Sequence, residues 1–431
     1  MTEPHHDATG AAPAGAALAR LLGGTDRERF ATTYWGRTLH LADAAARGDD
    51  AFADLFSLDA VDELITDRGL RTPFLRVARD GSTLPERAFT AGGGIGAGIA
   101  DQVSDDKLLN LFADGATIVL QGLHRTWGPI REFSADLAAE LGHPVQVNAY
   151  ITPPQNQGFD DHYDVHDVFV LQIHGEKRWA LRQPVLDAPL RDQLWTDRRG
   201  EVEARAAEPA HTETTLRPGD CLYLPRGWIH SARALGGVSA HLTIGVHQWT
   251  RHHLAEALLE RSRGGLRDAT QVRASLPLGA DLTDAASLAE DVELAREALV
   301  EAIRSLPADD IVGVLRGRER AAQRPSPIAP LAQLAAVEKL AIEDELRLRP
   351  HLMVDVLPGS SEEEVVVSSR AGRFRMPATH LPLLRLLLDE GRVEVRALAA
   401  EENEALELAR SWLRHGVALR GCAAQGAFGA A

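Results

Sequence analysis

The sequence predicts an α+β protein with an antiparallel β-sandwich or barrel in its first half and helices in its second half. From residue 144 to about 250, short runs of β-branched and aromatic residues alternate with Gly, Pro and Asp turns. Many short strands at even spacing are typical of a sandwich or barrel. From about 251 to 345, apolar residues recur at helical spacing. The length of 431 residues allows two or three domains.

The composition excludes several classes of protein. A net charge of −16 argues against general attraction to nucleic acid or anionic membranes, so we expect no direct nucleic-acid binding. We find neither a long apolar run of the kind that spans a membrane nor a signal-peptide pattern. Cys221 and Cys422 lie far apart and belong to no disulfide or zinc motif. These features indicate a cytoplasmic protein without a membrane segment.

The chain ahead of the barrel reads as a disordered lead over residues 1–14, followed by a mixture of helices and strands. The Gly-rich segment 91–100 lacks the spacing of a dinucleotide or phosphate loop, so we interpret it as a plain loop. The patterns predict helices at 18–23, 26–35, 59–69 and 129–143, and strands at 72–81 and 115–124. The barrel strands are predicted at 145–152, 167–175, 177–182, 213–225 and 239–249.

The second half of the chain divides into a helical block and a small α/β unit. Apolar stripes predict helices at 252–262, 287–306 and 331–348, and an apolar face left over on them would suit a dimer surface. From residue 346, strand-like runs and two helices that end at Gly391 and Gly416 resemble a winged helix in their order. Residues 362–420 contain nine Arg and ten Asp plus Glu, so this unit is nearly neutral and is not suited to binding a phosphate backbone.

Three side chains suggest a metal site. His162 and Asp164 are two residues apart on a segment that we predict to be a β-strand, so their side chains point to the same face. His230 follows 68 residues after His162, at the end of the motif GD-x5-RG-x2-H. Two His and one carboxylate form the facial triad of non-haem Fe(II) oxygenases, although the same set also suits zinc. A single buried His is more often an ordinary core residue, and it is the combination that favours a metal.

A cosubstrate anchor would favour iron over zinc. Lys177 lies fifteen residues after His162, and only three lysines occur in this Arg-rich chain. A lysine inside the pocket could bind the far carboxylate of 2-oxoglutarate, whose keto-acid end chelates the metal. Asn148, Tyr150 and Thr243 are further candidates for binding this cosubstrate, and ordinary core hydrogen bonding explains each of them equally well.

These residues carry a resemblance to a known family. The motifs NxYITPP, QGF, HYD, DVFVLQ and G-x-K-x-W occur together and in order, and GDCLYLPRGWIH follows them. The chain resembles the JmjC-type ribosomal oxygenases of the cupin superfamily. The resemblance implies a double-stranded β-helix (JmjC/cupin) barrel over residues 15–250, a helical dimerisation region at 251–345 and a winged-helix-like domain at 346–431.

The same resemblance implies roles for single residues. His162, Asp164 and His230 match the family's Fe(II) ligands, Lys177 matches the lysine that binds the 2-oxoglutarate C5 carboxylate, and Asn148 matches a pocket asparagine. The family hydroxylates the β-carbon of a histidine or arginine in a ribosomal protein. ITPP, HYD and Lys177 are more similar to its histidyl than its arginyl branch. His166 stands where relatives more often carry an acidic residue, and we expect it behind the metal ligands or at the surface.

The predicted function is therefore that of an Fe(II)- and 2-oxoglutarate-dependent oxygenase that uses O2 to hydroxylate a protein side chain. The partners implied are a ribosomal protein substrate and a second copy of the chain as a homodimer. Three alternatives remain. The first is the same chemistry on a peptide or small-molecule natural product, and the second is demethylation of N-methyl-lysine. The third is a regulator whose cupin senses a ligand without catalysis.

Overall fold

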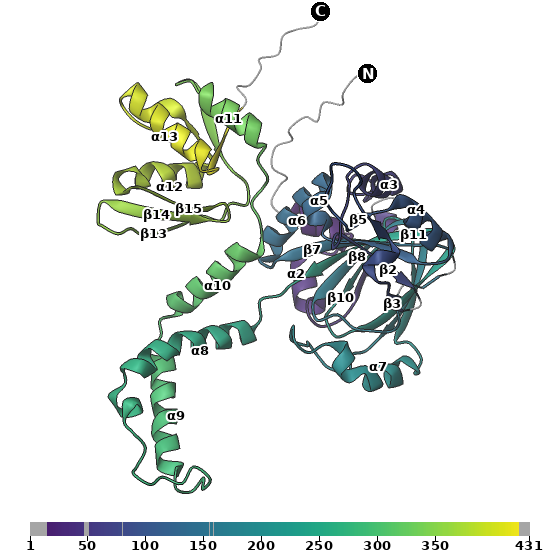
Figure 1. Cartoon of the computed structure of the whole chain (residues 1–431), viewed down its shortest axis with the longest axis horizontal. Coiled ribbons are helices and arrows are strands. Elements are labelled where there is room, and N and C mark those ends of the chain that lie inside the picture. Colours follow the sequence, from purple (N-terminus) through teal and green to yellow (C-terminus); the bar gives the residue numbers. More distant parts are fainter. Residues whose placement is uncertain (1–14, 47–50, 80, 155, 158, 422–431) are drawn as a thin grey trace, which may run out of the picture. The chain divides into compact units, whose positions relative to one another are not determined.

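A computed structural model describes residues 15–46, 51–79, 81–154, 156–157 and 159–421. The lead predicted at residues 1–14 and Cys422 lie outside the described residues. The chain divides into two compact units, Met1–Gln248 and Trp249–Ala431, which are coloured from purple to teal and from teal to yellow in Figure 1. Within the described residues, no helix is both long and apolar enough to cross a membrane.

The helices predicted at 18–23, 59–69 and 129–143 form in the N-terminal unit, whereas the one predicted at 26–35 is a short α-helix followed by a π-helical turn. Ser57 and Ser104 cap two helices of this unit, because each hydroxyl accepts a hydrogen bond from the backbone N–H three residues later. Gly142, at a φ of 69°, ends the helix before the barrel. The helices are α1 (Ala16–Leu22), α2 (Arg27–Arg29), α3 (Leu58–Thr66), α4 (Asp105–Ala113), α5 (Leu123–Thr126), α6 (Gly128–Leu141) and α7 (Arg199–Ala206). Helices α4, α5 and α7 were not predicted.

The strands of this unit build one nine-stranded, wholly antiparallel sheet, which bears out the predicted α+β class. Its order is β1-β10-β8-β11-β7-β6-β2-β3, and β9 pairs with β8. The strands are β1 (His40–Ala42), β2 (Leu75–Arg79), β3 (Ser82–Thr83), β6 (Thr117–Leu120), β7 (Val145–Thr152), β8 (Asp167–Arg182), β9 (Thr212–Leu216), β10 (Cys221–Leu224) and β11 (Ile229–Val246). A separate pair, β4 (Thr90–Ala91) and β5 (Gln102–Val103), flanks the predicted loop.

Two long strands, β8 and β11, shape the barrel. The two strands predicted at 167–175 and 177–182 are one continuous strand, and β11 begins ten residues earlier than predicted. The first half of β8 pairs with β10 and the second half with β9, while β11 pairs with both halves. The β8–β11 register shifts between Leu235 and Ala240, opposite Gly175. Each strand therefore serves two parts of the sheet, as strands do at a barrel corner.

Gly175 and Gln172 explain two of the sequence motifs. Gly175 has a φ of 63°, and a Cβ at this position would lie 2.1 Å from the carbonyl oxygen of Val238. The buried amide nitrogen of Gln172 donates to the carbonyl oxygens of His174 and Gly175 and to the Ser239 hydroxyl, at 2.9, 3.0 and 2.9 Å. The Gly of G-x-K-x-W and the Gln of DVFVLQ thus fix the bend that precedes Lys177.

Gly175→Ala is expected to lower the free energy of unfolding by about 2 kcal/mol or more. The left-handed backbone alone costs a residue with a Cβ about 1–2 kcal/mol, and the Val238 carbonyl must also move. The measurement is the urea midpoint of the barrel followed by circular dichroism. Gly237→Ala is the matched control, because a Cβ there meets no atom within 4 Å. Equal midpoints for the two variants would contradict this account of the bend.

The main hydrophobic core of the N-terminal unit fills the space between one face of the sheet and the helices. Phe30, Phe89 and Phe169 are each no more than 1% exposed within it. A second cluster around Trp179 and Leu222 lines the other part of the sheet. The barrel interior is therefore divided between packed side chains and the cavity described below.

The C-terminal unit begins with helices. α8 (Arg251–Asp268), α9 (Ala289–Arg304) and α10 (Ala308–Ala322) come first, followed by α11 (Pro330–Glu338). We did not predict α10. The helix predicted over 331–348 is wrong in its second half, because α11 ends at Glu338 and Glu345–Leu348 is the strand β12. Asp344 makes the turn between them, with its carboxylate accepting from the Ala341 N–H at 2.7 Å.

The remaining elements of this unit form two small antiparallel sheets with helices. The sheets have the orders β16-β12-β17 and β13-β14-β15. Trp412 is fully buried in a core shared by both sheets and the helices. The elements are β12 (Glu345–Leu348), β13 (Asp355–Pro358), β14 (Glu364–Ser369), β15 (Gly372–Pro377), α12 (Leu381–Glu390), β16 (Arg392–Glu394), α13 (Glu402–Arg414) and β17 (Ala418–Arg420).

Candidate functional site

The segment that carries His162 and Asp164 is held against the start of β11. His162 and His230 exchange two backbone hydrogen bonds, at 3.2 and 2.9 Å, and the Gly227 N–H donates to the Asp164 carbonyl at 3.0 Å. The prediction of a strand around His162 is wrong. Only the single bridge between His162 and His230 forms there, and β8 begins at Asp167. The backbone still alternates, since Tyr163 is buried on the opposite side from its two neighbours, with its hydroxyl donating to the Gln193 carbonyl at 2.9 Å.

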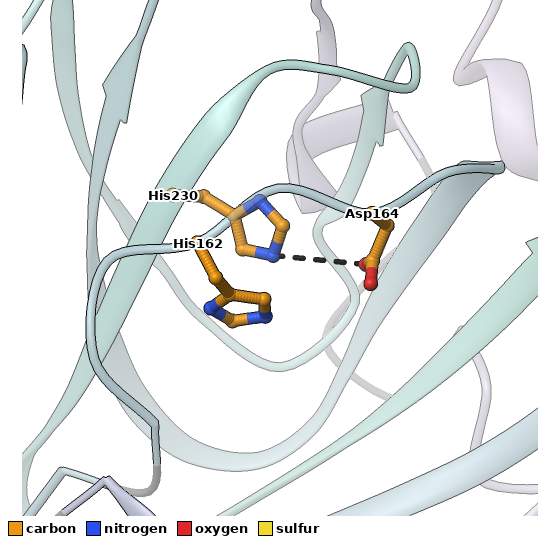
Figure 2. Close-up of side chains that lie close together, drawn as sticks. All are labelled: His162, Asp164 and His230. Atoms are coloured by element: carbon orange, nitrogen blue, oxygen red, sulfur yellow. Dashed lines mark ion pairs between the residues drawn. The ribbon is translucent and has the colours of Figure 1, made fainter. Parts of the chain in front are cut away.

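The structure brings His162, Asp164 and His230 together. One ligand atom from each lies within 4.8 Å of the others, and His230 Nε2 is 3.8 Å from Asp164 Oδ2. Figure 2 shows both imidazoles and the carboxylate converging from two separate stretches of backbone, with this contact dashed. The exposed fractions are 9% for the His230 side chain and 33% for that of Asp164, so one side of the cluster remains open. Three ligands with an open side are what a catalytic metal requires.

Backbone carbonyl groups fix both histidine tautomers. His162 Nδ1 lies 2.7 Å from the Asp160 carbonyl oxygen, and His230 Nδ1 lies 3.0 Å from that of Trp228. A carbonyl oxygen only accepts, so each Nδ1 carries the proton and donates it. Each Nε2 therefore presents its lone pair toward Asp164. This is the arrangement in which metal-binding histidines are usually held.

The protonation states of the ligands also favour a bound metal cation. Burial and the neighbouring His162 lower the pKa of His230 to about 4, so its ring is neutral at pH 7 and able to bind metal. Burial acts to raise the pKa of Asp164, but the electrostatic effect of the three neighbouring histidines and Arg76 outweighs it and the pKa is lowered. Asp164 is thus a carboxylate at neutral pH. The donor set of two imidazoles and one carboxylate fits Fe(II) or Zn²⁺.

A cavity of about 260 Å³ opens beside the three ligands. Its walls combine charged and polar side chains with aromatic and aliphatic ones. The lining residues are Arg76, Thr117, Tyr150, Phe159, His162, Asp164, Val168, Val170, Lys177, Trp179, Trp195, His230, Ser231, Ala232, His241 and Thr243.

Lys177 lies in the buried end of this cavity and is only 3% exposed. Its Nζ donates to the Thr152 hydroxyl at 3.1 Å and lies 3.4 Å from Nδ1 of His241. Burial lowers the pKa of Lys177 to about 7. Within the described part of the chain, no carboxylate forms an ion pair with Lys177. A buried cation without an acid is costly, so this end of the cavity is suited to an anionic ligand.

The three weaker candidates are placed differently. Tyr150 and Thr243 line the cavity. Asn148 is the cross-strand neighbour of Thr243, but its Oδ1 accepts from the Gly122 N–H at 3.1 Å and its side chain hydrogen-bonds to Tyr150. Asn148 is therefore engaged with its neighbours and does not line the cavity.

His166 lies behind Asp164, outside the cavity lining. Its Nε2 is 3.4 Å from the Gln146 amide nitrogen, and its ring centroid is 4.9 Å from that of His247. Its charge lowers the pKa of Asp164. His166 thus acts on the site through a ligand rather than as a ligand.

Several residues that line the cavity or contact its lining were not predicted from the sequence. Thr152 had a signal, because it lies in the ITPP motif. Trp179 ends G-x-K-x-W, and its Nε1 is buried without a hydrogen-bond partner among the described residues. No sequence pattern pointed to Arg76, because it lies on β2, far from every motif. Phe159 and Trp195 lie at ring-centroid distances of 6.1 and 6.3 Å from His162.

The class of this barrel follows from a comparison with protein families. Residues 130–254 match the JmjC domain, and they include the three ligands, Lys177 and the long strands β8 and β11. The chain therefore carries a JmjC domain, as the motifs predicted.

The relatives are more specific. "Ribosomal oxygenase 1" of Homo sapiens is 35% identical over 182 residues, which is 41% of this chain and 28% of that protein. "Bifunctional lysine-specific demethylase and histidyl-hydroxylase NO66" of Drosophila persimilis is 32% identical over 165 residues, or 38% of this chain and 23% of that protein. The matches thus span less than a third of these relatives. They confirm the resemblance to ribosomal oxygenases.

A solved structure extends the similarity to most of the chain. The ribosomal oxygenase YcfD from Escherichia coli, in complex with cobalt and 2-oxoglutarate, aligns over 92% of this chain and 98% of its own, with a TM-score of 0.51 and 16% identity. At this identity the similarity establishes the fold alone. It confirms the predicted JmjC/cupin architecture.

Proposed function

We propose that this protein is an Fe(II)- and 2-oxoglutarate-dependent oxygenase that hydroxylates a protein side chain. One observation carries the proposal. Two imidazoles and a carboxylate face a cavity whose buried end holds Lys177, with no acid paired to it among the described residues. Zinc hydrolases need no such cation, whereas 2-oxoglutarate has a second carboxylate to place. The relatives named as oxygenases and the cobalt and 2-oxoglutarate bound by YcfD support the same chemistry.

Each group in the cavity has a task under this proposal. His162, Asp164 and His230 would hold Fe(II), which with 2-oxoglutarate and O2 would supply the oxidation of a substrate C–H bond to C–OH, with succinate and CO2 as the other products. Lys177 binds the far carboxylate. Val168 and Val170 supply apolar wall and limit the water that reaches this end. Substrate enters beside Phe159 and Trp195 and is positioned for reaction.

The substrate we propose is a ribosomal protein, and the target residue a histidine. The names of the relatives and the motifs ITPP, HYD and G-x-K support this choice. Demethylation of N-methyl-lysine is a second candidate, because the Drosophila relative is named for both activities. Formaldehyde release would separate demethylation from stable hydroxylation.

Succinate formation tests the enzyme. The Fe(II)-loaded protein, supplied with 2-oxoglutarate under air and with host ribosomal proteins, is expected to form succinate and to add one oxygen atom to one histidine, detected by mass spectrometry. Turnover without a modified ribosomal protein would move the search to peptides or small molecules. Absence of turnover in the iron-loaded protein would contradict the oxygenase and favour a ligand-sensing cupin.

We further propose that the second half of the chain serves assembly and that the enzyme acts in the cytoplasm. Several apolar side chains on α8, α9 and α10 are 38–57% exposed, which supports a homodimer formed through these helices: Leu254, Leu259, Val292, Leu294, Val300 and Val312. The nearly neutral C-terminal α/β unit would act as a winged-helix-like scaffold or protein contact. Light scattering after size exclusion that shows a monomer would contradict the dimer.

A further inference from the structure

Arg76 is a second cation that lines the cavity. A row of cross-strand neighbours begins at Arg76. Arg76 on β2 is paired with Val119 on β6, and Val119 is paired with Tyr150 on β7. Tyr150 is in turn paired with His241 on β11. Cross-strand partners share one face of a sheet, so this row runs along the cavity wall. Three strand spacings separate β2 from β11, or roughly 14 Å along the sheet. Lys177 contacts His241 at the far end of the row.

The Arg76 guanidinium is held in place without being neutralised. Its Cζ lies 5.2 Å from the centroid of the Phe159 ring, and it hydrogen-bonds to Tyr150. Its Nε is buried and has no hydrogen-bond partner within the described part of the chain. No carboxylate there forms an ion pair with Arg76, although its charge lowers the pKa of Asp164. The side chain is thus positioned by packing and by one hydroxyl, and its other donors remain available to a ligand.

The charges of the loaded site leave Arg76 unpaired. A divalent metal, the Asp164 carboxylate, the two carboxylates of 2-oxoglutarate and Lys177 together carry no net formal charge. The charge that remains in the cavity is that of Arg76. The two carboxylates of 2-oxoglutarate are thus matched by the metal and Lys177, and neither of them needs Arg76. The group that meets Arg76 must therefore come with the substrate.

We propose that Arg76 binds an oxygen acceptor of a peptide substrate, a carbonyl or a carboxylate, and thereby selects the segment presented to the metal ligands. This inference rests on the proposed function. Planar guanidinium groups are suited to such oxygens because they donate two parallel hydrogen bonds in a fixed geometry. The Phe159 ring contacts the guanidinium, and its centroid lies 6.1 Å from that of the His162 ring, so it links Arg76 to the metal ligands.

Peptide retention tests the proposal without turnover. Protein loaded with Mn(II) and 2-oxoglutarate is immobilised and offered peptides from digested host ribosomal proteins, and the retained peptides are quantified by mass spectrometry. Arg76→Gln is expected to retain the peptides at least tenfold less than the wild type, and Arg76→Lys to recover part of the loss. Arg79→Gln is the matched control, since Arg79 lies on the same strand outside the cavity lining and should retain peptides as the wild type does.

A second pool of the same peptides, in which the carboxylates have been converted to amides, identifies which oxygen atom Arg76 binds. Retention that persists and still depends on Arg76 assigns a main-chain carbonyl, and retention lost with amidation assigns a carboxylate. Mn(II) binding measured by electron paramagnetic resonance should be equal in all four proteins. Three results would overturn the proposal: equal retention by Arg76→Gln, loss of Mn(II) in that variant, or no peptide retained by the wild type. Succinate formed by the iron-loaded wild type without peptide reports separately on the proposed function.

Discussion

His162→Ala is expected to abolish succinate formation and to weaken metal binding by more than about 100-fold. Removing a partner that merely orients a ligand costs about 10–100-fold in metal affinity, so removing one of three ligands costs more. The remaining His230 and Asp164 cannot close a three-point site. Equilibrium dialysis with Mn(II) and a succinate assay measure the two effects.

His166→Ala is the control for His162→Ala. His166 lies two residues from Asp164 but outside the cavity lining, so its loss removes a nearby imidazole without removing a ligand. We expect it to change metal affinity far less than His162→Ala does. Equal losses in the two variants would show that the triad has been assigned to the wrong histidine.

Lys177→Met is expected to raise the dissociation constant of 2-oxoglutarate by about 150- to 4,000-fold. Leaving one partner of a buried ion pair uncompensated costs about 3–5 kcal/mol, and methionine fills a similar volume without the charge. Metal binding should be retained, because Lys177 makes no contact with the triad. Calorimetric titration of 2-oxoglutarate into the Mn(II)-loaded protein measures the change. An unchanged dissociation constant would remove Lys177 as the anchor.

The pH dependence of the same titration gives an independent test. The pKa of Lys177 is lowered to about 7, so in the ligand-free protein the amine is protonated below pH 7 and neutral above it. A carboxylate ligand favours the protonated form, so binding above pH 7 requires uptake of a proton. The dissociation constant should then rise roughly tenfold per pH unit above pH 7 and level off below it. Lys177→Arg should abolish this dependence, because an arginine stays protonated.

The ligands could be predicted from the sequence because they depend on short-range geometry. His162 and Asp164 point the same way in any extended backbone, and their site formed although the regular strand around them did not. His230 and Lys177 were recognisable because glycines mark their positions. Gly227, at a φ of 89°, precedes His230, and Gly175 precedes Lys177.

The rest of the cavity depends on pairing between distant strands, which no local pattern encodes. Arg76 reaches the site only because β2 pairs with β6 and β6 pairs with β7. Helix α10 was missed because Gly313 and Gly317 weaken its helical signal. In the same way, Glu345–Leu348 has a helical composition but pairs with strands on both sides, and this tertiary pairing overrides propensity.

Titration of the Fe(II)-loaded protein with 2-oxoglutarate in the absence of air tests the central claim most directly. A 2-oxo acid that chelates iron at an open facial triad produces a visible absorption band that neither component has alone. We predict that the band appears with the wild type at neutral pH, weakens strongly in Lys177→Met and is absent in His162→Ala. A wild-type protein that binds Fe(II) but develops no band with 2-oxoglutarate would contradict the account.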